Sequence, residues 1–219
     1  MIKRAIATVT AALSVALAFA AHARGIDVDK VNGSIHIEGD QQAGELSTVN
    51  GGIRVDSGGS AQKVSTVNGG IELGDRVTVD SVETVNGGIE LGQGAHVART
   101  VEAVNGHIAL AHGADVAGKT SNVNGRITLD AAHVGGGLET VSGDVEIGAD
   151  SRVEGGLLVE QPHGWSWGNN KNPRIVIGPR AVVTGTLEFR RDVDLYVSDT
   201  AHVDAIKGAT AKKFSGDHP

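Results

Sequence analysis

Two tryptophans that stand two positions apart are the clearest recognition signal in this chain of 219 residues. Trp165 and Trp167 lie with His163 and Asn169 in a polar run, residues 161–173, that is rich in Gly, Pro and Asn. Indole rings stack on sugar rings and anchor protein partners, and the imidazole and amide groups add hydrogen bonds. These four residues form the candidate binding loop, for a glycan or an envelope protein. The alternative is that the indoles fold back over an apolar outer face of the protein.

Acidic residues recur at one position of an 18-residue repeat, at Glu72, Glu90 and Glu146. Paired carboxylates are the chemistry of glycosidases and of calcium sites. However, Arg54 and Ala109 interrupt the position, and the glycine- and aspartate-rich nonapeptide of calcium-binding β-helices does not occur. We therefore interpret this position as a solvated face, and we expect no catalytic residue and no enzyme activity.

The histidines are dispersed along the chain. His107 and His112 lie five residues apart, and His96 and His133 could approach them if the chain coils. A metal site needs convergent ligands with supporting hydrogen bonds, and none of the strong ligand motifs or any cysteine occurs. We expect exposed histidines, no metal and no cofactor.

Threonine also recurs at one position of the repeat, and such a column could form a flat ice-binding face. Ala103 and Asn122 break it, and cross-coil hydroxyl and packing contacts explain the threonines more simply. The threonines are Thr48, Thr66, Thr84 and Thr140.

The repeat that must position all these residues is built on the tripeptide Val-Asn-Gly. Its asparagines are spaced by 18, 18, 18, 19 and 19 residues, and Val141-Ser142-Gly143 continues the series after 18 more. Each Asn-Gly predicts a corner, because both residues tolerate positive φ, and stacked asparagine amides would form a hydrogen-bonded ladder. The corner column consists of Asn32, Asn50, Asn68, Asn86, Asn105 and Asn124.

Apolar residues stand three and five places after each asparagine, as at Ile71 and Leu73, with mostly polar residues between them. This alternation with a period of two predicts strands. Eighteen residues are too few for a strand, a helix and their connections. We therefore predict an all-β, single-domain parallel β-solenoid with coils of about 18 residues and about three short faces each. A series of β-hairpins is the alternative, since Asn-Gly also favours hairpins, but the near-identical units favour the solenoid.

The composition agrees with a narrow, repetitive interior. The chain has 32 glycines, only 3% aromatic residues, and no Phe, Trp or Tyr from position 20 to position 164. Such an interior has to be filled by Val, Ile, Leu and Ala, unlike the core of a conventional enzyme. The net charge of −7 argues against nucleic acid as a partner, because phosphate binding needs a basic surface.

The N-terminus reads as a Sec-type secretory signal peptide cleaved after Ala23. Lys3 and Arg4 precede an apolar stretch that is too short for a stable membrane span, and Ala21-His22-Ala23 has the small-x-small cleavage pattern. We expect a periplasmic or secreted bacterial protein with no stable membrane anchor after cleavage. The absence of cysteine means that packing alone must stabilise it.

We divide the chain into a signal peptide (1–23), regular Val-Asn-Gly coils (24–160), an insertion loop (161–173), continuing irregular coils (174–205) and a C-terminal cap and tail (206–219). Nine or ten coils would make a rod about 45 Å long at the strand spacing. The terminal coils would expose unpaired strand edges, so end-to-end self-association is a further expectation.

The units Thr66–Leu73 and Thr84–Leu91 resemble the bacterial adhesin β-strand-repeat family, a domain class of predicted solenoids. The segment that begins at Ile175 is similar to bactofilins, polymer-forming β-helical proteins that are typically cytoplasmic or membrane-associated, from which the export signal departs. Neither resemblance implies catalytic residues. Together they imply a structural or adhesin-like interaction role in the envelope, with a self-assembling polymer and a carbohydrate-binding or carbohydrate-active β-helix protein as alternatives.

Overall fold

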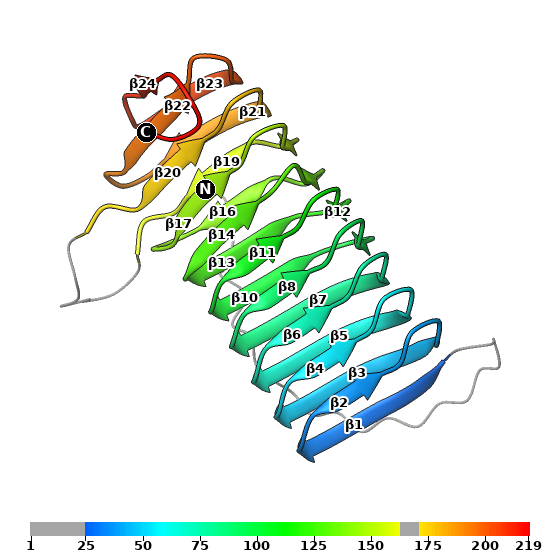
Figure 1. The fold of residues 1–219 in the computed structure, drawn as a ribbon. Helices are drawn as coiled ribbons and strands as arrows, with labels where there is room; N and C mark the ends of the chain where they lie inside the picture. Colours follow the sequence, from blue (N-terminus) through cyan, green and yellow to red (C-terminus); the bar gives the residue numbers. More distant parts are fainter. Residues whose placement is uncertain (1–24, 163–170) are drawn as a thin grey trace.

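The computed structural model describes residues 25–162 and 171–219, which form a parallel β-solenoid (Figure 1). Across these two ranges the chain contains strands and no helix, so no helix there could cross a membrane. The strands stack coil upon coil along one axis, and the first and last coils lie at opposite ends of the rod (Figure 1). The predicted fold class is confirmed.

Two parallel sheets make up the solenoid. Sheet B contributes one short strand to each of ten coils and consists of β2 (Ile35–Ile37), β4 (Ile53–Val55), β6 (Ile71–Leu73), β8 (Ile89–Leu91), β11 (Ile108–Leu110), β14 (Arg126–Leu129), β17 (Asp144–Ile147), β20 (Arg174–Ile177), β22 (Asp194–Ser198) and β24 (Lys212–Phe214).

Sheet A has 14 strands and contains the longer side of each coil. It consists of β1 (Ile26–Asn32), β3 (Ala43–Asn50), β5 (Ser60–Asn68), β7 (Thr78–Asn86), β9 (His96–Val97), β10 (Val101–Asn105), β12 (Asp115–Val116), β13 (Thr120–Asn124), β15 (His133–Val134), β16 (Leu138–Thr140), β18 (Arg152–Val153), β19 (Leu157–Val159), β21 (Val182–Phe189) and β23 (His202–Lys207).

The coils differ from the expected three short faces. The early coils have only two sides, a three-residue strand in sheet B and an unbroken strand of eight or nine residues in sheet A, as in β6 and β7. From β9 to β19 the long side is split by a bend, which gives three segments per coil. In β21 and β23 the long side is a single strand again, with an irregular register between Val183 and Thr186. The cause is one added residue: Val97 pairs with Val79 and Val101 with Val82, so three residues must fit where the coil below has two.

The core lies between the two sheets and is built from inward columns of aliphatic side chains. In sheet B, Ile71 pairs with Ile53 and Ile89, and Leu73 pairs with Val55 and Leu91, and all of these side chains are buried. In sheet A, Leu46, Val64, Val82 and Val101 stack in the same way. Each buried methylene contributes about 0.8 kcal/mol, so these columns supply most of the stability of the rod.

One aromatic side chain enters this interior, contrary to the expectation that only small aliphatic residues would fit. Phe189 at the end of β21 is buried, in the column that contains Val159 and Thr140. The next residue in the column is Gly208, whose backbone lies against that of Phe189. A Cβ on Gly208 would overlap the carbonyl oxygen of Phe189, so only glycine fits at this position above the buried ring.

The glycines at the Asn-Gly corners are required mainly by close packing. A Cβ on Gly69 would overlap the carbonyl oxygen of Gly51, and a Cβ on Gly87 would overlap that of Gly69. None of the six corner asparagines has a positive φ, and among these glycines only Gly33, Gly87 and Gly125 do. The expected freedom of φ therefore explains part of the corner, and the stacking of backbone on backbone explains the rest.

The insertion sits at this same corner. Val145 pairs with Ile175, a step of 30 residues where the regular repeat has 18, so 12 additional residues lie between β19 and β20. Beyond it, β20 to β24 continue both sheets, and residues 206–219 contain the end of β23 and all of β24. The corner from which the loop leaves is therefore in line with the asparagine column.

Candidate functional site

The four residues of the candidate binding loop, His163, Trp165, Trp167 and Asn169, lie outside the described residues. The proposed signal peptide, residues 1–23, also lies outside them. The structure does describe both ends of the insertion, at Gln161 and Pro162 on one side and at Lys171 and Asn172 on the other.

An open cavity of about 350 Å³ lies at the base of the insertion, lined by Gln161, Pro162, Asn172, Arg191 and Asp192. The guanidinium of Arg191 donates to the backbone carbonyl of Val141 at 3.1 Å and to the hydroxyl of Ser142 at 3.3 Å. Arg191 follows β21, so this contact joins positions 50 residues apart. The cavity presents amide, guanidinium and carboxylate groups, which together donate and accept hydrogen bonds.

The asparagine column leads directly to this cavity. Each asparagine donates from Nδ2 to Oδ1 of the asparagine one coil below, over 2.9–3.1 Å, from Asn50 up to Asn124. Ser142 occupies the next position, and there Arg191 supplies the polar contact. Because each amide has a second N–H and further acceptor capacity, the corner is a continuous polar track that ends at the cavity.

A second column, here called the valine stripe, runs along the outer face of sheet A beside the asparagines. Each valine follows an inward residue of the Thr48 column, so alternation along the strand turns it outward. Val31 is 64% exposed, Val123 is 38% exposed, and the others are half-buried. The stripe comprises Val31, Val49, Val67, Val85, Val104, Val123 and Val141.

The threonine column faces inward, which removes it as an ice-binding face. Thr48, Thr66 and Thr84 are 2–4% exposed. Their hydroxyls donate to the carbonyls of Gly33, Gly51 and Gly69 in the coil below, over 2.9–3.1 Å. These hydrogen bonds attach the corner glycines to the core.

The recurring carboxylates are on the outer face of sheet B, but they do not form a pair that acts on one ligand. Glu72 and Glu90 are paired in adjacent coils. Each of them contacts a basic side chain from the coil on the side away from the other glutamate. Glu72 accepts from Arg54 at 2.6 Å, and Glu90 contacts His107 at 3.1 Å. Glu146 stands three coils beyond Glu90, with Ala109 and Thr128 between them. The geometry is that of an ion-paired surface.

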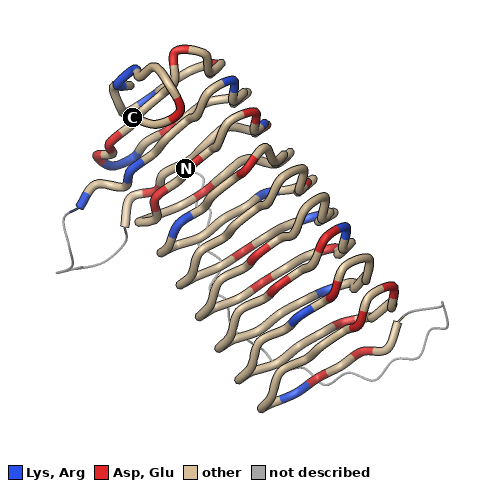
Figure 2. The backbone as a smooth tube through the Cα atoms, in the orientation of Figure 1, with Lys and Arg blue, Asp and Glu red and all other residues tan. Residues whose placement is uncertain are grey.

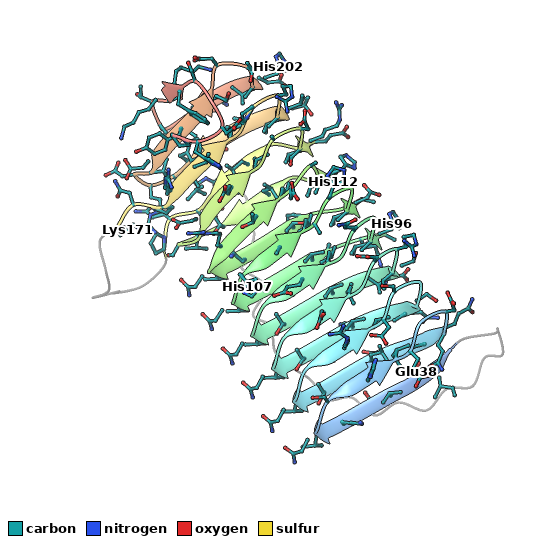
Figure 3. All side chains as sticks on the ribbon, viewed as in Figure 1. Glu38, His96, His107, His112, Lys171 and His202 are labelled. Atoms are coloured by element: carbon teal, nitrogen blue, oxygen red, sulfur yellow. The ribbon has the colours of Figure 1, made fainter. Side chains whose placement is uncertain are left out.

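His96 and His133 come together around a carboxylate, and not around His107 and His112. Nδ1 of His96 is 2.7 Å from one oxygen of Asp115, and Nδ1 of His133 is 2.5 Å from the other. Partial burial raises the pKa of Asp115, but the hydrogen bonds from His133 and His96 outweigh it, so the pKa lies below its usual value. His96 and His112 appear on the side of the rod opposite His107 (Figure 3).

In the part of the chain that the structure describes, no group of three or more His, Asp or Glu side chains is placed to hold a metal ion. Charged residues are scattered over the turns and the outer faces, while the Asn-Gly corner is mostly uncharged (Figure 2). The polar track and the cavity are thus set apart from the ion-paired surfaces.

The sequence signalled the asparagines and the loop but not the residues that line the cavity. Arg191 and Asp192 lie in a turn without a motif, and they reach the corner only through the fold. The valine stripe could have been predicted from the sequence, because a residue that follows an inward-facing one in a strand faces outward.

Comparisons with protein-family models, with curated proteins and with solved structures find no match to this chain. Its function therefore has to be argued from its own geometry.

Proposed function

We propose that this chain is an exported, non-enzymatic interaction protein of the bacterial envelope that binds a glycan where the 161–173 insertion leaves the rod. In this proposal the solenoid is a rigid support that carries the binding loop and the polar corner below it. The observation that carries the proposal is the asparagine track that ends at the cavity beside Arg191.

The chemistry of the cavity favours a glycan over an apolar ligand. Gln161 and Asn172 offer amides, Asp192 a carboxylate and Arg191 a guanidinium, and hydroxyl groups both donate to and accept from such side chains. Trp165 and Trp167 lie in the sequence between Pro162 and Asn172, which line the cavity. Their indoles would add the apolar surface on which a sugar ring stacks.

The arrangement of the scaffold also supports binding rather than hydrolysis. Glu72 and Glu90 already have Arg54 and His107 as partners, so neither is poised as a free acid or base. Export is proposed from the sequence of residues 1–23, and an envelope location would bring the chain into contact with polysaccharide.

Co-sedimentation of the purified chain with insoluble peptidoglycan and with immobilised envelope polysaccharide tests the proposal. We expect binding that is abolished when residues 163–170 are replaced by a short Gly-Ser linker, and weakened at least fivefold in Arg191→Ala. Arg99→Ala is the matched control, because Arg99 lies in the bend between β9 and β10, where it pairs with Asp80.

The urea midpoint of each variant would show that the rod is still folded. A chain that binds neither polysaccharide, or binds them equally well without the loop, would refute the proposal. Processing after Ala23, read from the N-terminal sequence of the protein recovered from the periplasm or medium, tests the export step separately.

A further inference from the structure

Each end of the described rod carries a lysine in a column whose residues are buried in the coils between the two ends. Lys30 in β1 pairs with Thr48, which is 2% exposed. Lys213 in β24 pairs with Val197, which is fully buried. Both lysines are exposed, and no further coil lies beyond them among the described residues. Figure 2 shows basic residues on the first and the last coil.

These ends are otherwise suited to stack on one another. Among the described residues, β1 and β2 pair on one side only, with β3 and β4, and β23 and β24 pair on one side only, with β21 and β22. Their free edges therefore expose unpaired N–H and C=O groups of the kind that recruit another chain. If two molecules stacked end to end in the solenoid register, β23 would meet β1 and β24 would meet β2 of the next copy.

Such a joint would bury both lysines between two cores. The inward residues of the four terminal strands are otherwise apolar, for example Val28 and Ile35 at one end and Val203 and Ile206 at the other. No carboxylate stands in these inward positions to neutralise an ammonium group. Burial of an unpaired charge is strongly unfavourable, so the joint would be penalised twice.

The contacts of Lys30 show how the end is closed. Thr48, Thr66 and Thr84 donate to a corner glycine in the coil below. Lys30 has no described coil below it, and its ammonium donates to the carbonyl of Ser34 in its own coil, at 2.7 Å. The side chain therefore satisfies a backbone acceptor of the terminal coil and places a charge beside the end of the core.

We infer that Lys30 and Lys213 close the two ends of the rod against end-to-end stacking with a second copy of this chain. This inference goes beyond the proposed binding function and is independent of the loop. It also separates this solenoid from a self-assembling polymer, because the same repeat with apolar or neutral residues at both positions would present continuous columns.

Light scattering and electron microscopy of the chain, expressed and processed in a bacterial host, test the inference. We expect the wild-type protein to have the mass of one chain at high concentration. The double variant Lys30→Thr with Lys213→Val restores the residue types of the two columns, and we expect it to elongate into rods whose mass rises at least tenfold with concentration.

The matched control is Lys63→Thr with Lys207→Thr, which removes the same charge from outward positions of β5 and β23. We expect it to remain a single chain. Wild-type protein that polymerises, a folded double variant that stays monomeric, or a control that elongates equally would each overturn the inference. Circular dichroism and the urea midpoint verify folding. We expect all of these variants to fold, because the substituted lysines are at least partly exposed.

Discussion

The early coils and the late coils hold together by different contacts, although both belong to the same two sheets. Between Ala43 and Leu91, many residues stack on identical ones: Ser47 on Ser65, Thr48 on Thr66 and Asn50 on Asn68. Between Arg174 and Phe214, nearly all cross-coil partners are unlike residues, and Val183 on Val203 is the exception. The contacts between unlike residues include the ion pairs Arg180–Asp150, Arg190–Glu160 and Lys212–Asp194.

The difference shows which residues a repeat can use in every coil. An asparagine amide both donates and accepts, so a column of identical asparagines is self-complementary. A column of identical charges repels itself, as it would at Glu72 and Glu90 without Arg54 and His107. Neutral residues therefore recur in the regular coils, and charged residues such as Glu72, Glu90 and Arg190 contact partners of another type. Because exposed ion pairs contribute little, we expect stability to depend on buried columns in both regions.

The largest effect should come from a charge placed in a buried column of the regular coils. Ile71 is 1% exposed between Ile53 and Ile89, so Ile71→Asp would bury a carboxylate without a partner. We expect a loss of about 5 kcal/mol in the free energy of unfolding, measured in urea.

Its neighbour Glu72 is the matched control. The side chain of Glu72 is half exposed and faces outward, so Glu72→Gln should leave the urea midpoint almost unchanged. Equal losses in the two variants would mean that the two faces of β6 are wrongly assigned.

In the late coils, the buried ring of Phe189 should matter more than the ion pairs around it. Phe189→Ala removes a buried aromatic side chain next to Gly208, and we expect a loss of about 3 kcal/mol. Arg190→Ala, which breaks the pairs with Glu160 and Glu188, should barely move the midpoint of thermal unfolding. A larger effect of Arg190→Ala would show that unlike pairs do stabilise this region and that the two regions differ in energy as well as in contacts.

The corner glycines of the regular coils give a third test. Gly69→Ala would drive a Cβ into the carbonyl oxygen of Gly51, and the backbone on both sides is held by the stack. We expect a loss of about 2 kcal/mol from overpacking, read from chemical unfolding.

Gly70→Ala is the control within the same corner. Its Cβ would lie 3.5 Å from the carbonyl oxygen of Gly88, an ordinary contact. If Gly70→Ala costs as much as Gly69→Ala, loss of backbone freedom rather than close stacking explains the glycine pair.

The strand faces of this molecule could be predicted from the sequence because they depend on alternation alone. Ile71 and Leu73 had to share a face, and the constant spacing of the asparagines required them to stack. The same counting would place Lys30, two residues before Asn32, in the column of Thr48. Lys30 can therefore be placed from the sequence once the fold is known, whereas Lys213 is placed only by the pairing of β24 with β22.

Other features depend on side-chain and backbone choices that spacing does not determine. The added residue of the 19-residue coils could sit anywhere in the coil, and only the pairing of Val97 and Val101 places the bend between them. The contacts of Glu72 with Arg54 and of Glu90 with His107 depend on side-chain rotamers. The approach of Arg191 to Val141 spans 50 residues and depends on how the irregular coils follow the insertion.

The smallest expected effect is a gain in stability, at a turn that lies between the two regions. Ala131 has a φ of 42°, while Gly113 with a φ of 72° and Gly94 with a φ of 62° hold the equivalent position in the two coils below. A side chain in the left-handed region costs about 1–2 kcal/mol, and the greater chain entropy of glycine offsets about half of this. Ala131→Gly should therefore raise the free energy of unfolding by about 0.5 kcal/mol.

The adjacent Ala132 provides the opposite case, because it is 2% exposed, faces the core and is not among the residues with positive φ. Ala132→Gly should lower the thermal midpoint, since it removes a buried methyl group and adds chain entropy without relieving strain. Opposite shifts from the same substitution at neighbouring positions would locate the strain in the turn. Parallel losses would mean that this turn tolerates a side chain in the left-handed region, as the positive φ values of Arg76 and Asp150 also indicate.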